Sequence, residues 1–351
     1  MAERNKHQSL IGMRLEELET YIEELGLEKF RAKQIFKWIY SKNVRDIDNL
    51  SDISKDARLK LQADPKALPI GSLNLITHQI SKDGTEKFLF ETKSGEKVES
   101  VLMKFEERDS VSACISSQIG CAVGCPFCAT GTLGFKKNLS AAEIIEQVLF
   151  MQNISGERID NIVYMGQGEP LSNYDNVVES IRMLRELVGI GVRHITVSTS
   201  GIVPRIDQLA KENLQINLAL SLHDPTDEGR DFLVPINKKW PVLEVINSLN
   251  RYELITNRRV TIEYVMLEGV NDSFEKAKIL GELVRNLHCN INLIPYNQTD
   301  VSDPFKRSPN SNIKKFKELL EKTSRNKTVT IRRERGHDIN AACGQLANKH
   351  Q

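Results

Sequence analysis

The feature that most constrains this chain is a cysteine-rich stretch in its first half. Four of its six cysteines lie within fifteen residues, from Cys114 to Cys128. The last three, Cys121, Cys125 and Cys128, have the spacing C-x-x-x-C-x-x-C, and several glycines flank them. Three thiolates on one short loop can hold a compact inorganic cluster, but they leave one ligand position open. Because catalytic metal sites keep such a position, the stretch indicates a reactive metal group.

Length, composition and charge restrict the kind of protein that can carry this loop. The chain has 351 residues, which is enough for one large α/β domain and a smaller one. No run approaches the roughly 20 apolar residues of a membrane helix, and the polar N-terminus does not resemble a signal peptide. We therefore expect a cytoplasmic protein with no membrane partner, in which clustered cysteines indicate metal or redox chemistry rather than structural disulfides. A net charge of +1 restricts any nucleic-acid contact to local patches.

The hydrophobic periodicity changes twice along the chain, which predicts three regions. Residues 1–70 have helical spacing, and residues 71–110 read as short strands separated by the turns Lys82-Asp-Gly-Thr and Lys93-Ser-Gly-Glu. From 111 to 351 strands and helices alternate. We expect a helical accessory domain, a small β-hairpin extension or linker, and a catalytic domain whose last segment carries Cys343.

The alternating part predicts parallel βα units. The expected strands are 112–117, 161–165, 194–198, 216–221, 259–265, 290–294 and 328–332. The expected helices begin near residues 140, 174, 203, 242, 274 and 313. About six units fit a partial barrel or a doubly wound sheet, and in either fold the site lies at the carboxyl ends of the strands.

Polar side chains follow several of these strands at that edge. The run Gly166-Gln-Gly-Glu-Pro170 follows the second strand, and the cysteine loop follows the first. Taken separately, each polar residue is more simply structural; taken together on successive strand ends, they predict a ligand-binding site. The expected contact residues are Gly168, Glu169, Ser198, Ser221, Leu222, His223 and Asn297.

Two metal groups are compatible with the three cysteines. A structural zinc ion has four ligands, and no fourth cysteine or histidine follows at a local spacing. His194 or His223 could supply the fourth ligand from another strand. An iron–sulfur cubane can use three thiolates and one outside ligand. The different-class alternative to an enzyme is therefore a zinc-stabilised RNA-binding protein without catalysis.

The motifs resemble those of one family when they are taken in order. C-x-x-x-C-x-x-C after the first strand is similar to the radical S-adenosylmethionine (SAM) superfamily, whose fold is a partial (βα)6 barrel. Cys114-Ile-Ser-Ser-Gln, Met165-Gly-Gln-Gly-Glu-Pro, Ser198-Thr-Ser-Gly, Leu220-Ser-Leu-His and Asp338-Ile-Asn-Ala-Ala-Cys-Gly-Gln-Leu then resemble the RlmN/Cfr family of ribosomal RNA adenine methyltransferases. The resemblance covers nearly the whole chain.

The resemblance implies roles for Cys343 and Cys114 in addition to the three cysteines of the loop. One SAM methylates the thiol of Cys343, and a second SAM, bound to a [4Fe-4S] cluster on Cys121, Cys125 and Cys128, gives a radical that activates this methyl group. The activated carbon adds to adenine, Cys114 resolves the adduct by forming a disulfide with Cys343, and Glu99 accepts the ring proton. Two SAM molecules are thus used per turnover, and a cellular electron donor serves the cluster and the disulfide.

The same resemblance implies the substrate. It indicates 23S rRNA, with tRNA as a further substrate, and a monomeric enzyme. Gly168-Glu-Pro170 favours carbon 2 of adenine, as in RlmN, with Cfr-type methylation of carbon 8 as the alternative. The basic residues of the N-terminal helices are either a solvated face or a phosphate-contacting surface. Two further basic clusters are candidates for that surface: Lys306, Arg307, Lys314, Lys315 and Lys317, and Arg332, Arg333 and Arg335.

Overall fold

A single ten-stranded sheet organises most of the molecule. The computed structural model describes residues 7–299 and 304–347. The strand order is β1-β2-β3-β4-β7-β8-β9-β10-β11-β12, and all pairs from β4 to β12 are parallel. The parallel strands are β4 (Ser110–Cys114), β7 (Asn161–Tyr164), β8 (Ile195–Thr199), β9 (Asn217–Ser221), β10 (Val260–Met266), β11 (Cys289–Pro295) and β12 (Val329–Ile331).

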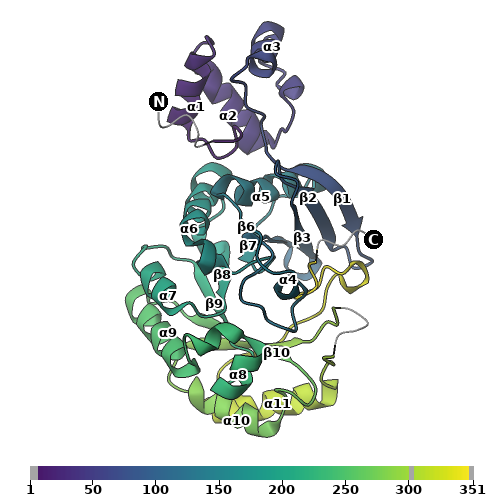
Figure 1. Cartoon of the computed structure of the whole chain (residues 1–351), viewed down its shortest axis with the longest axis vertical. Coiled ribbons are helices and arrows are strands. Elements are labelled where there is room, and N and C mark those ends of the chain that lie inside the picture. The colour runs from purple at the N-terminus through teal and green to yellow at the C-terminus, as the bar shows by residue number, and fades with distance from the viewer. Residues whose placement is uncertain (1–6, 300–303, 348–351) are drawn as a thin grey trace.

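Helices cover the outer side of this curved sheet (Figure 1). They are α5 (Ala141–Ser155), α6 (Tyr174–Met183), α7 (Val203–Leu209), α8 (Asp227–Leu233), α9 (Val242–Thr256), α10 (Phe274–Leu283) and α11 (Asn310–Thr323). Among the described strands, β1 and β12 stand at opposite ends of the sheet order, so the barrel is partial. The predicted α/β fold with a partial barrel is confirmed.

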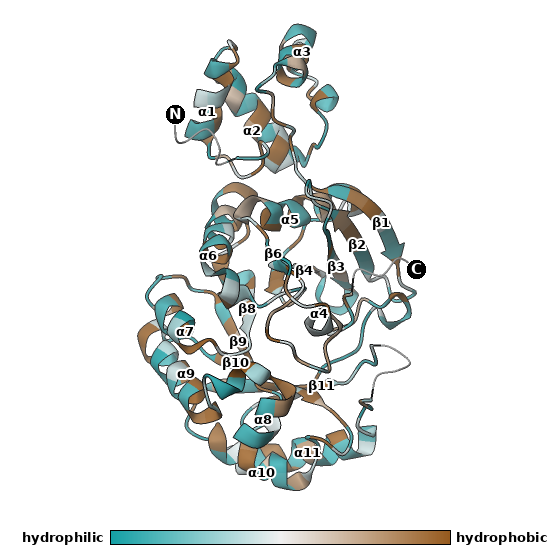
Figure 2. Ribbon diagram, viewed as in Figure 1, coloured by the Kyte–Doolittle hydropathy of each residue, from teal (hydrophilic) through white to brown (hydrophobic). Residues whose placement is uncertain are grey.

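Sequence periodicity explains these elements. Apolar side chains of the parallel strands are buried on both faces, as is typical of sheets covered by helices. Figure 2 shows the same pattern, with hydrophobic strands inside and mixed helices outside. The predicted capping box of α5 is present, because the Ser140 hydroxyl and the Glu143 carboxylate each accept a backbone N–H at that helix start.

Three antiparallel strands lie in the range 71–110, where a β-hairpin extension or linker is predicted. The hairpins β1 (Asn74–Ile80), β2 (Glu86–Glu91) and β3 (Lys97–Phe105) are continuous with the barrel, since β3 pairs antiparallel with β4. Strand periodicity was visible in the sequence, whereas the pairing of β3 with β4 is a long-range feature. These strands therefore form one wall of the catalytic sheet.

The N-terminal helices form a separate layer at one end of the molecule (Figure 1). They are α1 (Leu15–Glu24), α2 (Phe30–Lys42) and α3 (Lys55–Ala63). A buried carboxylate of α5, Glu146, connects this region to the barrel. It accepts hydrogen bonds from the Arg45 guanidinium and from the backbone N–H groups of Ser72 and Leu73. Within the described ranges, no helix is long and apolar enough to cross a bilayer.

Candidate active site

A cavity of about 700 Å³ opens at the carboxyl ends of the parallel strands. Most of the residues predicted from the sequence line it. They are Cys114, Cys121, Cys125, Cys128, Gly168, Glu169, Ser198, Ser221, His223, Asn297 and Cys343. Two predicted residues, Glu99 and Leu222, do not line it.

The cysteine loop follows β4 and is shaped by glycine. Gly120 has a φ of +70°, and a Cβ atom there would lie 1.7 Å from the carbonyl oxygen of Gly134. The loop therefore closes on itself only because this position has no side chain. The backbone N–H of Cys121 donates to the same Gly134 oxygen at 3.2 Å. This close approach holds Cys121 at the cavity wall.

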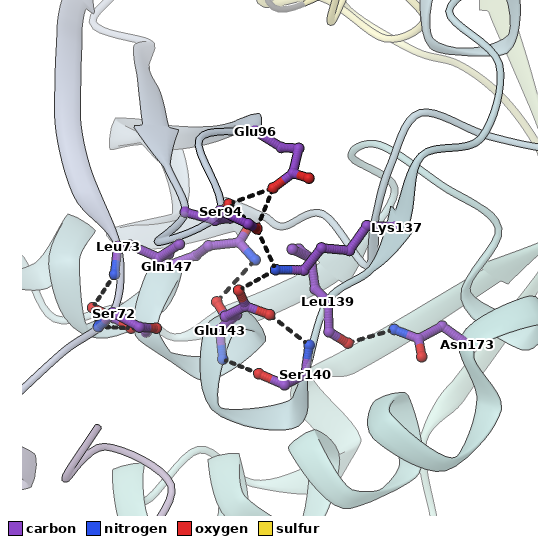
Figure 3. A network of polar contacts seen from close by, with 12 residues as sticks. Ser72, Leu73, Ser94, Glu96, Lys137, Leu139, Ser140, Glu143, Gln147 and Asn173 are labelled. Carbon is purple, nitrogen blue, oxygen red and sulfur yellow. Dashed lines mark hydrogen bonds and ion pairs between the residues drawn. The ribbon is translucent and has the colours of Figure 1, made fainter. Parts of the chain in front are cut away.

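A polar network fastens the exit of the loop to its surroundings (Figure 3). Lys137, in the short strand β6 (Lys137–Asn138), reaches the Glu143 carboxylate at 2.9 Å and the Ser94 hydroxyl at 3.4 Å. The Asn173 amide donates to the carbonyl of Leu139 at 2.7 Å. The loop is thus connected to the β2–β3 turn, to α5 and to the segment after β7.

The three thiols fit a cluster better than a single ion. Among the described residues, no three His, Cys, Asp or Glu side chains converge closely enough to hold one metal ion. In an iron–sulfur cluster each cysteine binds a different iron, so the thiolates stand further apart than around zinc. The three half-buried thiols of Cys121, Cys125 and Cys128, all facing one cavity, match that requirement.

Glu169 is buried beside the loop and already accepts three hydrogen bonds. They come from the Thr199 hydroxyl at 2.7 Å, the Ser200 N–H at 2.7 Å and the Leu171 N–H at 3.0 Å. A carboxylate accepts about four hydrogen bonds, so one position remains. Burial raises the pKa of Glu169. An ammonium group bound at the remaining position would stabilise its ionised form.

Gly168 joins this carboxylate to the cysteine loop. Its φ is +99°, and a Cβ atom would lie 2.5 Å from that of Gln118. The next residue, Glu169, donates its N–H to the Gln118 side-chain oxygen at 2.8 Å. The motif after β7 and the start of the cysteine loop therefore form one packed unit.

His223 stands at the end of β9 with a left-handed backbone, at a φ of +62°. Its Nδ1 accepts the backbone N–H of Val265 at 3.1 Å, so the tautomer with the proton on Nε2 is held. The ring meets Phe127 edge-on, with centroids 5.0 Å apart. Burial lowers the pKa of His223 to about 3. His223 is therefore a neutral donor at the cavity wall.

Three of the remaining predicted contact residues have polar side chains at the cavity, and the fourth does not line it. Ser198 and Ser221 stand side by side, with hydroxyl oxygens 3.2 Å apart. The Asn297 side-chain oxygen is buried and has no hydrogen-bond partner in the described part of the chain. Leu222 packs its side chain into the hydrophobic core instead, and its N–H donates to the Glu263 carbonyl.

The C-terminal segment brings Cys343 to the cavity. It leaves β12 at one end of the sheet and packs on β3 near the other, where Ala341 and Leu346 contact Val101 and Met103. Cys343 and Cys114, more than two hundred residues apart in sequence, thereby line the same cavity. Burial raises the pKa of Cys114 to about 12, and the nearby Arg332 guanidinium opposes that shift.

Glu99 lies under this segment rather than in the cavity. It is buried in β3, with one carboxylate oxygen 3.3 Å from the Lys87 ammonium. The other oxygen accepts the backbone N–H of Ala347 at 2.8 Å. The sequence showed the type and position of Glu99, but this docking depends on the path of the C-terminal segment.

Sequence reasoning missed three polar residues of the site. Arg230, in α8, is fully buried and donates to the carbonyls of Leu222 and Ser200. Glu263 and Arg332 line the cavity. Arg332 was expected on an RNA-facing surface with Arg333 and Arg335; it directly follows β12, and all three arginines line the cavity. Strand alternation was an available signal for Glu263, because it shares one face of β10 with Val265, which also lines the cavity.

Comparisons with known proteins agree with this geometry. The family model "Radical SAM superfamily" matches residues 115–278, and "Ribosomal RNA large subunit methyltransferase N-terminal domain" matches residues 8–65. A probable dual-specificity RNA methyltransferase RlmN from Staphylococcus aureus (strain JH9) is 45% identical over 349 residues, covering 98% of this chain and 94% of the relative. The chain belongs to the RlmN family of radical SAM RNA methyltransferases.

Other relatives of the RlmN family support the same assignment. The RlmN protein of Staphylococcus haemolyticus is 44% identical over 98% of this chain and 94% of its own length. The crystal structure of a radical SAM methyltransferase from Sphaerobacter thermophilus is 42% identical, with a TM-score of 0.91, covering 98% of this chain and 100% of that one. Membership of the radical SAM superfamily implies a [4Fe-4S] cluster and SAM as cofactors.

Proposed function

We propose that this chain methylates carbon 2 of an adenine in 23S rRNA and in tRNA. The observation that carries the proposal is the shared cavity: the three thiols of the cysteine loop, the carboxylate of Glu169 and the two distant thiols of Cys114 and Cys343 all line it. Relatives named as dual-specificity RNA methyltransferases support both RNA substrates. An RNA substrate also favours action in the cytoplasm, where ribosomes are.

Cys121, Cys125 and Cys128 would hold the cluster, which supplies the electron that cleaves SAM when it is bound. Glu169 has an acceptor position left for the SAM amino group. Gly168, Ser198, Ser221, His223 and Asn297 line the same cavity and would contact the rest of the cofactor, whereas Leu222 lies in the core behind it. His223 can donate from Nε2, because Nδ1 is engaged by Val265.

Cys343 would carry the methyl group as S-methylcysteine. Its side chain is exposed to the cavity, where a methyl donor and a base can both reach it. Cys114 would then attack the sulfur of Cys343, so that a disulfide forms and the methylated adenine leaves. The buried setting keeps Cys114 protonated until a nearby positive charge or base favours the thiolate. A cellular reductant would restore both thiols.

Glu99 is the proposed acceptor of the ring proton. Glu99 does not line the cavity and is hydrogen-bonded to the Ala347 N–H, so the C-terminal segment has to move before the target base can reach this carboxylate. Such a movement fits a reaction in which Cys343 first receives a methyl group and later approaches the RNA. The chain would act as a monomer, since all of these side chains come from one chain.

Labelled SAM tests the proposal directly. Protein prepared without oxygen should contain about four iron and four sulfide per chain, as one [4Fe-4S] cluster requires. With a reductant it should transfer the labelled methyl group to 23S rRNA and to tRNA. A colourless zinc protein with no transfer would support the non-catalytic alternative instead.

A further inference from the structure

A continuous row of polar side chains crosses the inner face of the sheet. Ser221 in β9 is in register with Glu263 in β10, Glu263 with Asn292 in β11, and Asn292 with Thr330 in β12. All four line the cavity. Strand interiors of parallel sheets are usually apolar, so four polar residues at one level of the barrel indicate a binding surface.

One atom in this row lacks a partner. The Glu263 Oε1 accepts a hydrogen bond from the Asn292 side-chain amide at 2.9 Å, and the Asn292 oxygen accepts one from Thr330. The Glu263 Oε2 is buried and has no hydrogen-bond partner within residues 7–299 and 304–347. Glu263 as a whole is only 4% exposed. Leaving a buried carboxylate oxygen without a hydrogen bond is unfavourable, so this atom points to a ligand with a donor group.

The position of Glu263 indicates which ligand that is. Arg332 lies two residues beyond Thr330 and lines the same cavity. Its charge acts on Glu263 and on the thiols of Cys343 and Cys114. Glu263 therefore belongs to the part of the cavity where the two thiols must meet the reacting base.

We propose that Glu263 binds the Watson–Crick edge of the target adenine, with Oε2 accepting a hydrogen bond from the exocyclic amino group. This inference rests on the proposed function. Enzymes that act on a base draw it out of its stack and recognise it by hydrogen bonds to that edge. Carbon 2 lies next to N1 on the same edge, so a base held by its amino group presents carbon 2 deep in the cavity. Asn292 keeps the carboxylate oriented.

The experiment compares two RNA substrates in the holoenzyme. One carries adenosine at the target position, and the other carries purine riboside, which lacks the amino group. We expect kcat/KM for adenosine to exceed that for purine riboside by about 10- to 100-fold in the wild type. In Glu263→Ala the ratio should fall to about one. In Glu263→Gln the hydrogen bond from the Asn292 amide keeps the glutamine oxygen facing Asn292. The glutamine NH2 then faces the adenine amino group, two donors meet, and the ratio should also fall to about one.

Controls separate this site from the cofactor site and from folding. Tyr252→Phe removes another buried oxygen that has no hydrogen-bond partner in the described ranges and does not line the cavity, so its ratio should equal that of the wild type. The SAM dissociation constant and the methylation of Cys343 should be unchanged in Glu263→Gln. Weaker SAM binding with an intact adenosine preference would assign Glu263 to the SAM ribose and overturn the proposal.

Two further outcomes distinguish a wrong role for Glu263 from a wrong proposed function. A wild type that methylates both RNAs equally well would overturn the role of Glu263 while leaving the proposed function standing. A wild type that methylates neither RNA but retains its cluster would contradict the proposed function itself. The adenosine-to-purine ratio is therefore read only from an enzyme whose methylated product has been identified.

Discussion

At the scale of single residues, Cys114 and Cys343 have different positions in the cavity. Cys343 is exposed on a segment after the last strand, whereas Cys114 is half-buried at the end of β4. The exposed thiol suits a carrier of the methyl group, and the half-buried thiol at the strand end suits the resolution of the adduct. If these roles hold, removing either thiol should stop turnover at a different stage.

Cys114→Ala should therefore trap a covalent complex between protein and RNA, because nothing remains to attack the sulfur of Cys343. Cys343→Ala should form none, since it has no thiol to carry the methyl group. Denaturing gel electrophoresis with labelled RNA measures both. Cys289→Ala is the control, because this buried cysteine starts β11 away from the cavity and should leave turnover near the wild-type rate. A missing crosslink in Cys114→Ala would remove Cys114 from the resolving role.

A second residue-scale prediction concerns acid stability. The folded-state pKa of His223 is about 3, well below the usual value of 6.5. Between these values the unfolded chain binds a proton that the folded chain does not, so stability rises with pH up to about 6.5 and is flat above it. From pH 7.5 to pH 5 this one group should lower the free energy of unfolding by about 2 kcal/mol.

Chemical unfolding of the wild type and His223→Asn at both pH values measures this difference. Asparagine tolerates the left-handed backbone at this position, so the variant changes the titrating group with little backbone strain. The variant should lose about 2 kcal/mol less than the wild type between pH 7.5 and pH 5. Equal losses in the two proteins would show that His223 protonates normally in the fold.

At the scale of elements, the β1–β2 turn holds the segment that carries Cys343. The Asp338 carboxylate accepts hydrogen bonds from the Ser81 hydroxyl and, at 3.2 Å, from the Lys82 N–H. The Asp83 carboxylate accepts the Gly336 N–H at 2.9 Å. These contacts join a hairpin from the first third of the chain to its last residues, and they place Cys343 over the cavity.

Asp338→Ala should lower the rate of RNA methylation about tenfold, because small displacements of a reacting group have large kinetic effects. SAM binding should stay unchanged, since Asp338 does not line the cavity. Single-turnover assays and SAM titrations measure the two properties. Asp56→Ala is a matched exposed control in α3. A loss of SAM affinity in Asp338→Ala would show that the turn supports the whole site rather than the Cys343 segment.

The elements also show what sequence can predict. The alternation of short apolar runs with helical segments indicated every parallel strand to within two or three residues. Strands that are buried on both faces of a sheet are nearly continuous apolar runs, so they can be recognised in the sequence. The short helix α8 and the hairpin of β5 (Gln118–Ile119) with β6 were not predicted. Both are too short for a period to develop, and in α8 the buried Arg230 makes tertiary contacts with Leu222 and Asn237 that the sequence does not show.

The candidate site likewise contains residues that the sequence predicts and residues whose positions it does not. Motif spacing predicted the group formed by Cys121, Cys125 and Cys128, since these residues are close in sequence, whereas the roles of Glu169, Cys114 and Cys343 were expected from the family resemblance. The docking of Glu99 on Ala347 and the position of Arg332 at the cavity depend on where the chain end crosses the barrel. A single sequence does not carry that information. Arg45 is a further case: its position just after the basic helix α2 gives no sign that it pairs with Glu146 and stacks on Phe150.

At the scale of the whole molecule, the N-terminal helices present an exposed basic face. Lys33, Lys37 and Lys42 of α2 are exposed, and the first two are four residues apart on one side of the helix. Lys29 and Arg31 are instead paired with Glu19 and Glu28. The three exposed lysines are the part of this domain best placed to contact phosphates.

Replacing these three lysines with glutamine should weaken RNA binding and lower the log–log salt slope by about 2, as expected for the loss of roughly three phosphate contacts. Reductive SAM cleavage without RNA should not change. Fluorescence anisotropy at several salt concentrations measures the slope. A matched triple variant removes exposed lysines from other surfaces: Lys211, Lys238 and Lys278. Equal slopes for both triple variants would place the RNA elsewhere, such as on Lys314 and Lys315 of α11.

The proposed function requires the molecule as a whole to direct a carbon radical to carbon 2 of adenine. Mass spectrometry of nucleosides released from 23S rRNA after incubation with the enzyme, SAM and a reductant tests it most directly. The product should co-elute with 2-methyladenosine and share its fragmentation. A product that matches 8-methyladenosine, or RNA that stays unmethylated with an intact cluster, would contradict the account.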